Sequence, residues 1–103
     1  MKFMVSWSIQ QDKWLPILKK WGSMTPQDRA NVGAGLKMIG RWHDSAGRRG
    51  VGIFEATDLS ALNRYLGQGN PFMDMDVAPV QDDEESAAWA TDNSPHSRGV
   101  NAR

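Results

Sequence analysis

The stretch that most constrains the fold is residues 36–56, LKMIGRWHDSAGRRGVGIFEA, which has the pattern of a β-hairpin. Its two arms, the first ending near Asp44 and the second starting near Gly50, alternate side chains between two faces, as a pleated strand requires. The Gly- and Arg-rich segment between the arms is typical of a turn. We therefore expect a sheet organised around this hairpin.

Strict alternation assigns every side chain of the hairpin to a face. One face takes Leu36, Met38, Gly40, Trp42, Gly52, Phe54 and Ala56, and the other takes Lys37, Ile39, Arg41, His43, Val51, Ile53 and Glu55. The second face holds the chemically capable side chains Arg41, His43 and Glu55. The pattern thus predicts a polar cluster on one side of the sheet, with Trp42 on the other side in the core.

Further patterns precede the hairpin. Residues 2–9 alternate an apolar set (Phe3, Val5, Trp7 and Ile9) with a mixed one, which predicts a strand. An apolar stripe with helical spacing follows, made of Trp14, Leu15, Ile17, Leu18 and Trp21. Because proline is tolerated only in the first turn of a helix, Pro16 places the helix start near Asp12.

The remaining elements are indicated by capping residues. Thr25 followed by Pro26 predicts a short second helix, and Asp58 begins a third with Leu59, Leu62, Tyr65 and Leu66 inward. Residues 75–80 form a strand whose Pro79 suits an edge. Asp82 and Glu85 can cap a short acidic helix over residues 82–90, and residues 91–103 have the composition of a tail.

This order, β-α-β-β-α-β, predicts an α+β fold of the ferredoxin-like type, with a four-stranded antiparallel sheet over residues 1–80. Right-handed crossovers put both helices on one face of that sheet. The face with Ile39, Val51 and Ile53 would stay open although it is too apolar to be left to solvent. We therefore expect something to cover it.

Three partners could cover that open face: a second copy, single-stranded RNA or another protein. Two sheets packed face to face would form a closed, barrel-like homodimer with a cavity between sheet and helices. RNA would need aromatic stacking positions on the third strand, where this chain has Val51, Ile53 and Ala56, and Glu55 would repel phosphate. We expect the homodimer and no nucleic-acid binding.

The composition argues against disulfide-linked proteins, thiolate metal sites and membrane proteins. With no cysteine, the chain can form neither a disulfide nor a thiolate metal site. The apolar run at the start is too short and too polar for a signal peptide or a membrane span. We therefore expect a cytoplasmic protein that has no membrane partner. Net charge is zero, but residues 1–73 hold ten Lys/Arg against five Asp/Glu and residues 74–103 two against seven.

His43 is the natural acid/base candidate near neutral pH, with Glu55 to orient it and Arg41 to bind a carboxylate or phosphate. Ser6, Ser8 and Lys37 share the predicted face and are candidate ligand-binding residues. The alternative is that the polar residues only satisfy one another across a dimer interface. The side chains around His43 offer too few ligands at a convincing spacing to bind a metal. We expect the tryptophans to pack in the core, so no cofactor is needed to explain them.

Three segments resemble a known family: MKFMVSWSI at the start, GRWHD at residues 40–44, and VAPV at residues 77–80 with the acidic run after it. The chain is similar over roughly residues 1–88 to a small bacterial family catalogued as a domain of unknown function. That family is similar in topology to the dimeric α/β-barrel superfamily, which includes cofactor-free monooxygenases, isomerases and haem-processing proteins. The resemblance implies the fold and the dimer. It supplies no catalytic residue.

Two functional hypotheses follow. The first is a dimeric α/β-barrel that binds or transforms a small organic compound, anionic if Arg41 binds it. The second is a non-enzymatic binding or accessory module of the same fold. Independently of both, Trp89 within the acidic segment predicts that residues 81–90 dock on the basic body of the same copy or of its partner.

Overall fold

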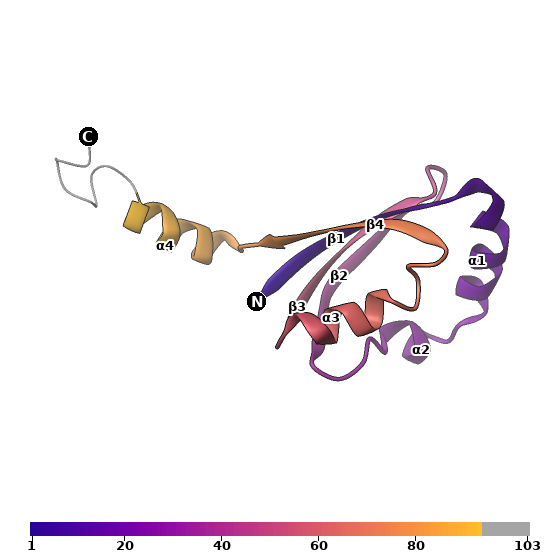
Figure 1. Ribbon diagram of the computed structural model, residues 1–103, viewed down its shortest axis with the longest axis horizontal. Coiled ribbons are helices and arrows are strands. Elements are labelled where there is room, and N and C mark those ends of the chain that lie inside the picture. Colours follow the sequence, from indigo (N-terminus) through magenta and orange to yellow (C-terminus); the bar gives the residue numbers. More distant parts are fainter. Residues whose placement is uncertain (94–103) are drawn as a thin grey trace.

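The computed structural model describes residues 1–93 and shows a single sheet with α1, α2 and α3 on one of its faces (Figure 1). Its four strands are β1 (Lys2–Ile9), β2 (Leu36–Asp44), β3 (Arg49–Ala56) and β4 (Met73–Val80). The helices are α1 (Gln11–Ser23), α2 (Pro26–Ala30), α3 (Leu59–Leu66) and α4 (Asp83–Asn93). All strand pairs are antiparallel in the order β2-β3-β1-β4, which confirms the predicted ferredoxin-like topology.

The predicted caps explain where the shorter helices begin. The Thr25 hydroxyl accepts a hydrogen bond from the Asp28 N–H at the start of α2, and the Asp58 carboxylate accepts one from Ala61 N–H at the start of α3. These bonds satisfy amide groups that the helix itself leaves unpaired. Local sequence therefore sets these helix starts. α1 differs, because it begins at Gln11 and carries Pro16 beyond its first turn.

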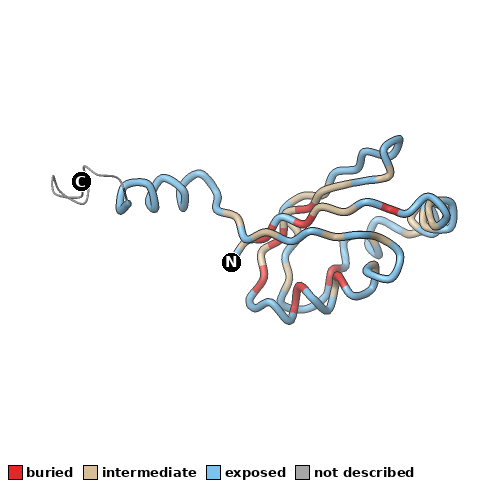
Figure 2. The backbone as a smooth tube through the Cα atoms, turned by 45° about the horizontal axis from the view of Figure 1, so that its top comes forward, coloured by how far each residue is buried: buried red, intermediate tan, exposed pale blue. Residues whose placement is uncertain are grey.

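The core lies between β1, β3 and α3. Phe3, Val5 and Phe54 point from the sheet to Leu62 and Leu66 of α3, and all five side chains are buried. Figure 2 shows buried positions on these strands and on α3, while α1 and α4 are largely exposed. Leu59 was predicted to face inward, but it is 53% exposed at the first position of α3.

A β-bulge changes which side of the sheet the second half of β2 presents. Met38 pairs with Phe54 and Gly40 with Ile53, so Ile39 is an extra residue between them. Because a shift of one residue exchanges the two faces of a strand, every side chain after the bulge is turned over. The strict alternation assumed from the sequence is therefore wrong beyond Met38.

The bulge moves two members of the predicted cluster, Arg41 and His43, to the helix-covered face and leaves Glu55 on the open face. Arg41 lies opposite Gly52 and His43 opposite Gly50, on the face that carries Phe54. Trp42, predicted to be in the core, lies opposite Val51 on the open face and is 59% exposed. The predicted positions of Arg41, His43 and Trp42 are all corrected by this single inserted residue.

α1 has the predicted apolar stripe but buries none of it. Leu15 is 56% and Leu18 41% exposed, and Trp14, Ile17 and Trp21 are only half-buried. The stripe therefore does not complete the core. The helix stands away from the sheet, and a cavity lies beneath it.

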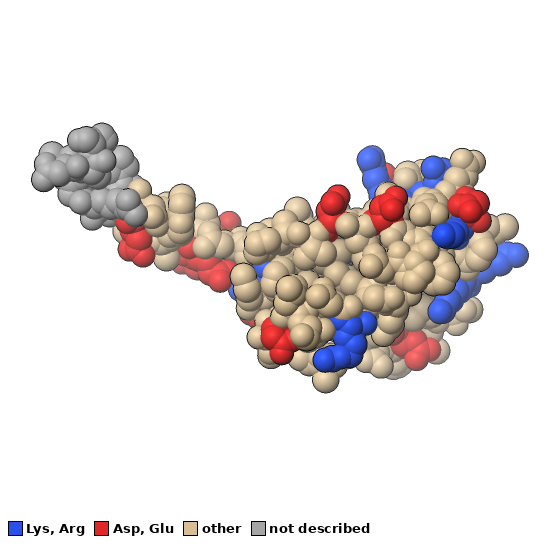
Figure 3. Space-filling view, viewed as in Figure 1, with Lys and Arg blue, Asp and Glu red and all other residues tan. Residues whose placement is uncertain are grey.

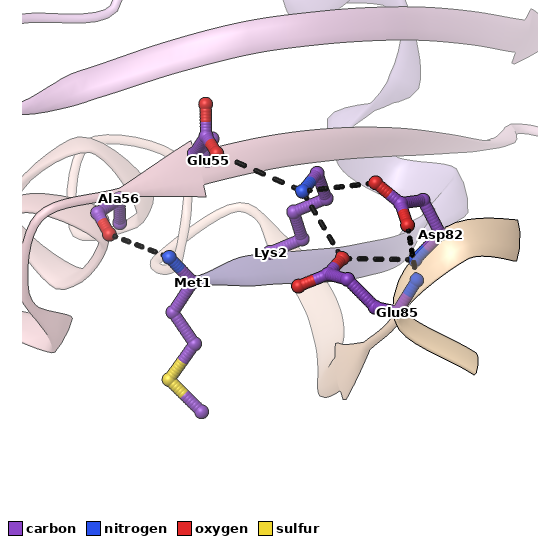
Figure 4. Close-up of polar contacts among 6 residues, drawn as sticks. All are labelled: Met1, Lys2, Glu55, Ala56, Asp82 and Glu85. Atoms are coloured by element: carbon purple, nitrogen blue, oxygen red, sulfur yellow. Dashed lines mark hydrogen bonds and ion pairs between the residues drawn. The ribbon is translucent and has the colours of Figure 1, made fainter. Parts of the chain in front are cut away.

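α4 continues from β4 and projects away from the body (Figure 1). Asp82 and Glu85 form the predicted capping box, each accepting a hydrogen bond from the other's backbone N–H. Lys2 joins this start to the sheet, with its Nζ 3.1 Å from Glu85 Oε1, 3.3 Å from Asp82 Oδ2 and 3.7 Å from Glu55 Oε2 (Figure 4). The hydrogen bonds to Glu85 and Asp82 raise the pKa of Lys2.

Beyond this start, α4 has no packing partner in the described part of the chain. Trp89 is 58% exposed, so the prediction that it docks on its own copy is wrong, and docking on a partner stays a prediction. The helix also runs to Asn93, past the predicted end at residue 90, and the rest of the predicted tail lies outside the described residues. None of the described helices is both long and apolar enough to cross a membrane.

Candidate functional site

A cavity of about 890 Å³ lies between the helix-covered face of the sheet and the helices α1, α2 and α3. Its apolar wall comes from both layers and includes Val5, Trp7, Phe54, Trp14, Ile17 and Trp21. The apolar stripe of α1 therefore lines a space instead of filling a core. Such a wall suits the apolar part of an organic molecule.

Two glycines of β3 make room for the large rings on this face. A Cβ on Gly50 would lie 2.3 Å from the Trp7 indole, and one on Gly52 would lie 2.6 Å from the Phe54 ring. Any larger residue at either position would force these rings to move from their present places. The glycines therefore allow these two rings to lie close against the sheet.

Arg41 is fixed at one end of the cavity by three contacts. Its guanidinium donates hydrogen bonds to the Tyr65 hydroxyl at 3.0 Å and to the Arg29 carbonyl oxygen at 2.8 Å. The same group lies over the Trp21 ring, 4.6 Å from its centre, in cation–π geometry. Since a guanidinium has five N–H donors and these two hydrogen bonds use two of them, three have no partner within residues 1–93.

His43 lies beside Arg41, between two tryptophans. Its ring centre is 5.8 Å from that of Trp7, edge to face, and 5.1 Å from that of Trp21. Desolvation by these neighbours, and then the positive charge of Arg41, lower the pKa of His43 below its usual 6.5. The imidazole is therefore neutral near pH 7 and can accept a proton.

The charged groups around the cavity are mainly cationic. Four cations line it (Lys13, Lys20, Arg29 and Arg41) against two carboxylates (Asp12 and Asp28). Within residues 1–93, neither Arg29 nor Arg41 forms an ion pair. Arg29 donates instead to the Met24 carbonyl oxygen and lies 5.8 Å from the Trp21 ring centre. The described lining thus has more cations than carboxylates, and its two arginines are not held in ion pairs within residues 1–93.

The other predicted site residues lie elsewhere. Ser6, Ser8, Lys37 and Glu55 are on the open face, on the opposite side of the sheet from Arg41. Glu55 pairs with Lys2 near one end of β3, whereas His43 lies opposite Gly50 near the other end. His43 and Glu55 therefore do not pair within one copy, and Ser6, Ser8 and Lys37 do not line this cavity; their role in ligand binding stays a prediction. Only Arg41 and His43 of the predicted set come together.

Sequence reasoning missed three contributors to the site: Trp21, Arg29 and Tyr65. Trp21 and Tyr65 have ordinary helical core spacing, and Arg29 lies on a five-residue helix with no motif. One signal was available, because a glycine inside a strand often marks a bulge, as Gly40 does here. No group of three metal-binding side chains occurs in the part of the chain that the structure describes.

The topology and this placement define an α+β domain of the ferredoxin-like type with a cavity beneath its first helix. The chain belongs to the family catalogued as domain of unknown function DUF3303, whose model matches residues 1–93. This confirms the family resemblance seen in the sequence and extends it through α4. None of the curated proteins matches the chain.

Proposed function

We propose that the chain binds a small organic anion in the cavity beneath α1. The observation that carries this proposal is Arg41, which is held by Tyr65, Arg29 and Trp21 but has no carboxylate partner in the described chain. An arginine fixed in this way can bind a carboxylate or phosphate through two parallel hydrogen bonds. Its rigidity reduces the entropy lost on binding.

The cavity sets the shape of the ligand. Sites for small molecules commonly measure roughly 300–1,000 Å³, and this one is near the upper end. Indole and phenyl rings on the wall favour a ligand with a planar or aliphatic body next to its anionic group. We therefore favour a compound such as an aromatic or medium-chain carboxylate over a bare inorganic ion.

His43 could add chemistry to binding. A neutral imidazole next to a guanidinium can take a proton from a bound acid while Arg41 stabilises the negative charge that develops. A purely binding module would need Arg41 and the apolar wall but not His43. Replacement of His43 by Gln should therefore leave binding largely intact in either case and abolish turnover only in an enzyme.

The binding proposal is tested by thermal unfolding with matched pairs of probes. Benzoate and hexanoate should raise the melting temperature, because a ligand stabilises the state that binds it, and the neutral amides benzamide and hexanamide should do so much less. Arg41→Met should remove the shift by the carboxylates. Arg64→Met is the matched control, because Arg64 is exposed on α3 and does not line the cavity.

Two results would contradict the proposal. One is that neither carboxylate shifts the wild-type melting temperature at any concentration. The other is an equal shift in Arg41→Met and wild type, which would place the anion elsewhere on the chain.

We also propose that a second copy covers the open face of the sheet. Met4, Ile39 and Trp42 are 37%, 48% and 59% exposed there, next to half-buried Val51 and Ile53. The Trp42 indole lies over Gly40, where an added Cβ would come within 2.2 Å of the ring. An apolar patch of this kind on one face commonly marks an interface.

The charges on the open face favour a second copy over nucleic acid. Lys37 lies at one end of the face, while Asp74 and Asp76 lie at the other end, opposite Ser8 and Ser6. Two copies packed with their strands reversed would bring Lys37 of each near these carboxylates of the other. Phosphate would be repelled by the same carboxylates, and among the four described strands Trp42 is the one aromatic residue on this face.

Sedimentation equilibrium tests this assembly. Trp42→Glu should weaken dimerisation strongly, because it places a charge at the centre of the apolar patch. Leu59→Glu is the control, since Leu59 is equally exposed but lies on α3, away from this face. A wild-type monomer at high concentration, or equal weakening by both variants, would exclude the open face as the interface.

A further inference from the structure

His43 lines the cavity, and neither of its ring nitrogens has a hydrogen-bond partner within residues 1–93. Its neighbours Trp7 and Trp21 contact it through their rings, and an indole has one N–H donor and no acceptor. In a neutral imidazole one nitrogen donates a hydrogen bond and the other accepts one. The protein therefore places an unpaired acceptor at the cavity, next to the unpaired donors of Arg41.

Arg41 and His43 lie side by side on this face of the sheet. They are alternate residues of β2, opposite Gly52 and Gly50, so their side chains leave the strand roughly 7 Å apart. Both also contact Trp21, whose ring centre is 4.6 Å from the Arg41 guanidinium carbon and 5.1 Å from the centre of the imidazole. A single small molecule that binds Arg41 through an anionic group can therefore reach His43 with a second polar group.

The geometry of this pair restricts where that second group lies on the ligand. The indole rings of Trp7, Trp14 and Trp21 line the cavity and favour an aromatic ligand. On an aromatic carboxylate, a hydroxyl ortho to the carboxylate donates its hydrogen to that carboxylate, and a para hydroxyl points directly away from it. A meta hydroxyl has neither restriction, so it suits two protein groups that lie side by side.

The surface around the cavity suits the approach of such an anion. Figure 3 shows Lys and Arg side chains gathered over the end of the molecule that carries α1, together with some acidic ones. Lys13 and Lys20 of α1 line the cavity, as do the carboxylates Asp12 and Asp28. Positive charge near a cavity raises the local concentration of anions.

We propose that the ligand is a hydroxylated aromatic carboxylate whose carboxylate binds Arg41 and whose meta hydroxyl donates a hydrogen bond to His43. The identity of this ligand rests on the anion site proposed above and adds a second polar contact to it. Benzoate has no hydroxyl, so its binding does not depend on that contact. His43 thus determines specificity among aromatic carboxylates.

Calorimetry at pH 8, where His43 is neutral, tests this contact with three probes. 3-Hydroxybenzoate should bind wild type roughly three- to tenfold more tightly than benzoate, because it forms one more hydrogen bond with the protein. 3-Methoxybenzoate should bind no more tightly than benzoate, since its ether oxygen can accept a hydrogen bond but cannot donate one. An equal gain from hydroxyl and methoxy would overturn the contact with the acceptor of His43.

Two variants of His43 locate the contact. His43→Phe should bind benzoate as wild type does, which shows that the cavity is intact, and should bind 3-hydroxybenzoate no more tightly than benzoate. His43→Gln is the matched variant, because its amide oxygen can still accept a hydrogen bond, and it should keep part of the preference. An undiminished preference in His43→Phe would assign the hydroxyl to another residue and overturn the proposal.

The same measurements distinguish a failure of this ligand from a failure of the anion site. Benzoate that binds wild type but not Arg41→Met, with no preference for 3-hydroxybenzoate, overturns the hydroxyl contact and leaves the anion site standing. Absence of binding by all three carboxylates contradicts both proposals.

Discussion

α3 and α1 occupy equivalent places in the fold, since each is a crossover helix on the same face of one sheet, yet they pack differently. α3 buries Ala61, Leu62 and Leu66 against Phe54 and its neighbours. α1 has an apolar stripe of similar length and buries no residue. The amphipathic pattern alone therefore does not decide whether a helix completes a core.

The difference originates in the sheet beneath each helix. Under α3 lie Phe3, Val5 and Phe54, which interlock with leucine side chains. Under α1 lie Trp7, Arg41 and His43, and Trp21 of the helix packs on Arg41 and His43 at distances of 4.6 and 5.1 Å between group centres. These bulky polar groups hold α1 away from the sheet and leave the space that we assign to a ligand.

The largest expected effect is on the free energy of unfolding, which should fall much more when a side chain of α3 is truncated than when one of α1 is. Leu62 is fully buried, so Leu62→Ala should lower the free energy of unfolding by about 2–5 kcal/mol through lost burial and the cavity left behind. Ile17→Ala on α1 should cost less than about 1 kcal/mol, because Ile17 already faces a cavity and alanine favours the helix. Urea unfolding checks both values. Equal losses would mean that α1 is packed as tightly as α3.

A second difference should appear in the dynamics of the free protein. Amides of α3 should exchange with solvent only in near-global unfolding, whereas α1, with no buried side chain, should open locally. We expect protection factors at least about tenfold lower in α1. Benzoate, if it fills the cavity, should raise protection in α1 and leave α3 unchanged. Uniform protection without ligand would contradict the comparison.

A fall in pH should lower the folding stability of the free protein but raise its affinity for an anionic ligand. The pKa of His43 is lowered in the free protein, so its contribution to folding stability is present above pH 6.5 and is lost as the pH falls below it. A bound carboxylate favours the imidazolium, so binding takes up a proton and benzoate affinity should rise on acidification, by at most about tenfold per pH unit. Calorimetry over the range in which benzoate stays ionised measures this. His43→Gln should abolish the rise, and a pH-independent affinity in wild type would place His43 outside the site.

The smallest expected effect concerns the start of α4. The pKa values of Asp82 and Glu85 are lowered, first by the capping hydrogen bonds between them and then by Lys2. The stability that these two carboxylates give to the start of α4 is therefore present above pH 4.5. It is lost as the pH falls through the lowered pKa values. Circular dichroism should show a small loss of helix in that range, and Lys2→Met should reduce it. An unchanged spectrum would show that this anchor does not hold α4.

Several elements of this protein were predictable because their causes are local. Thr25, Asp58 and Asp82 cap their helices through hydrogen bonds to amides three residues away, and the alternation of Phe3 and Val5 defines a strand. The element order then leaves few topologies, since crossovers are right-handed and connections are short. The candidate site was predictable only in Arg41 and His43, whose chemistry is visible in the sequence.

What only the tertiary structure decided is which side of the sheet these residues occupy and what surrounds them. The inserted Ile39 turns over the rest of β2, exchanging Trp42 with Arg41 and His43, and a period of two cannot reveal one extra residue. Likewise, Trp21 and Tyr65 have the spacing of ordinary core residues, and only the packing of α1 and α3 over Arg41 brings them to the cavity. The sequence by itself determined the strands, helices and topology, because these depend on neighbours in the chain. The cavity depends on contacts between residues far apart, so it required the assembled fold.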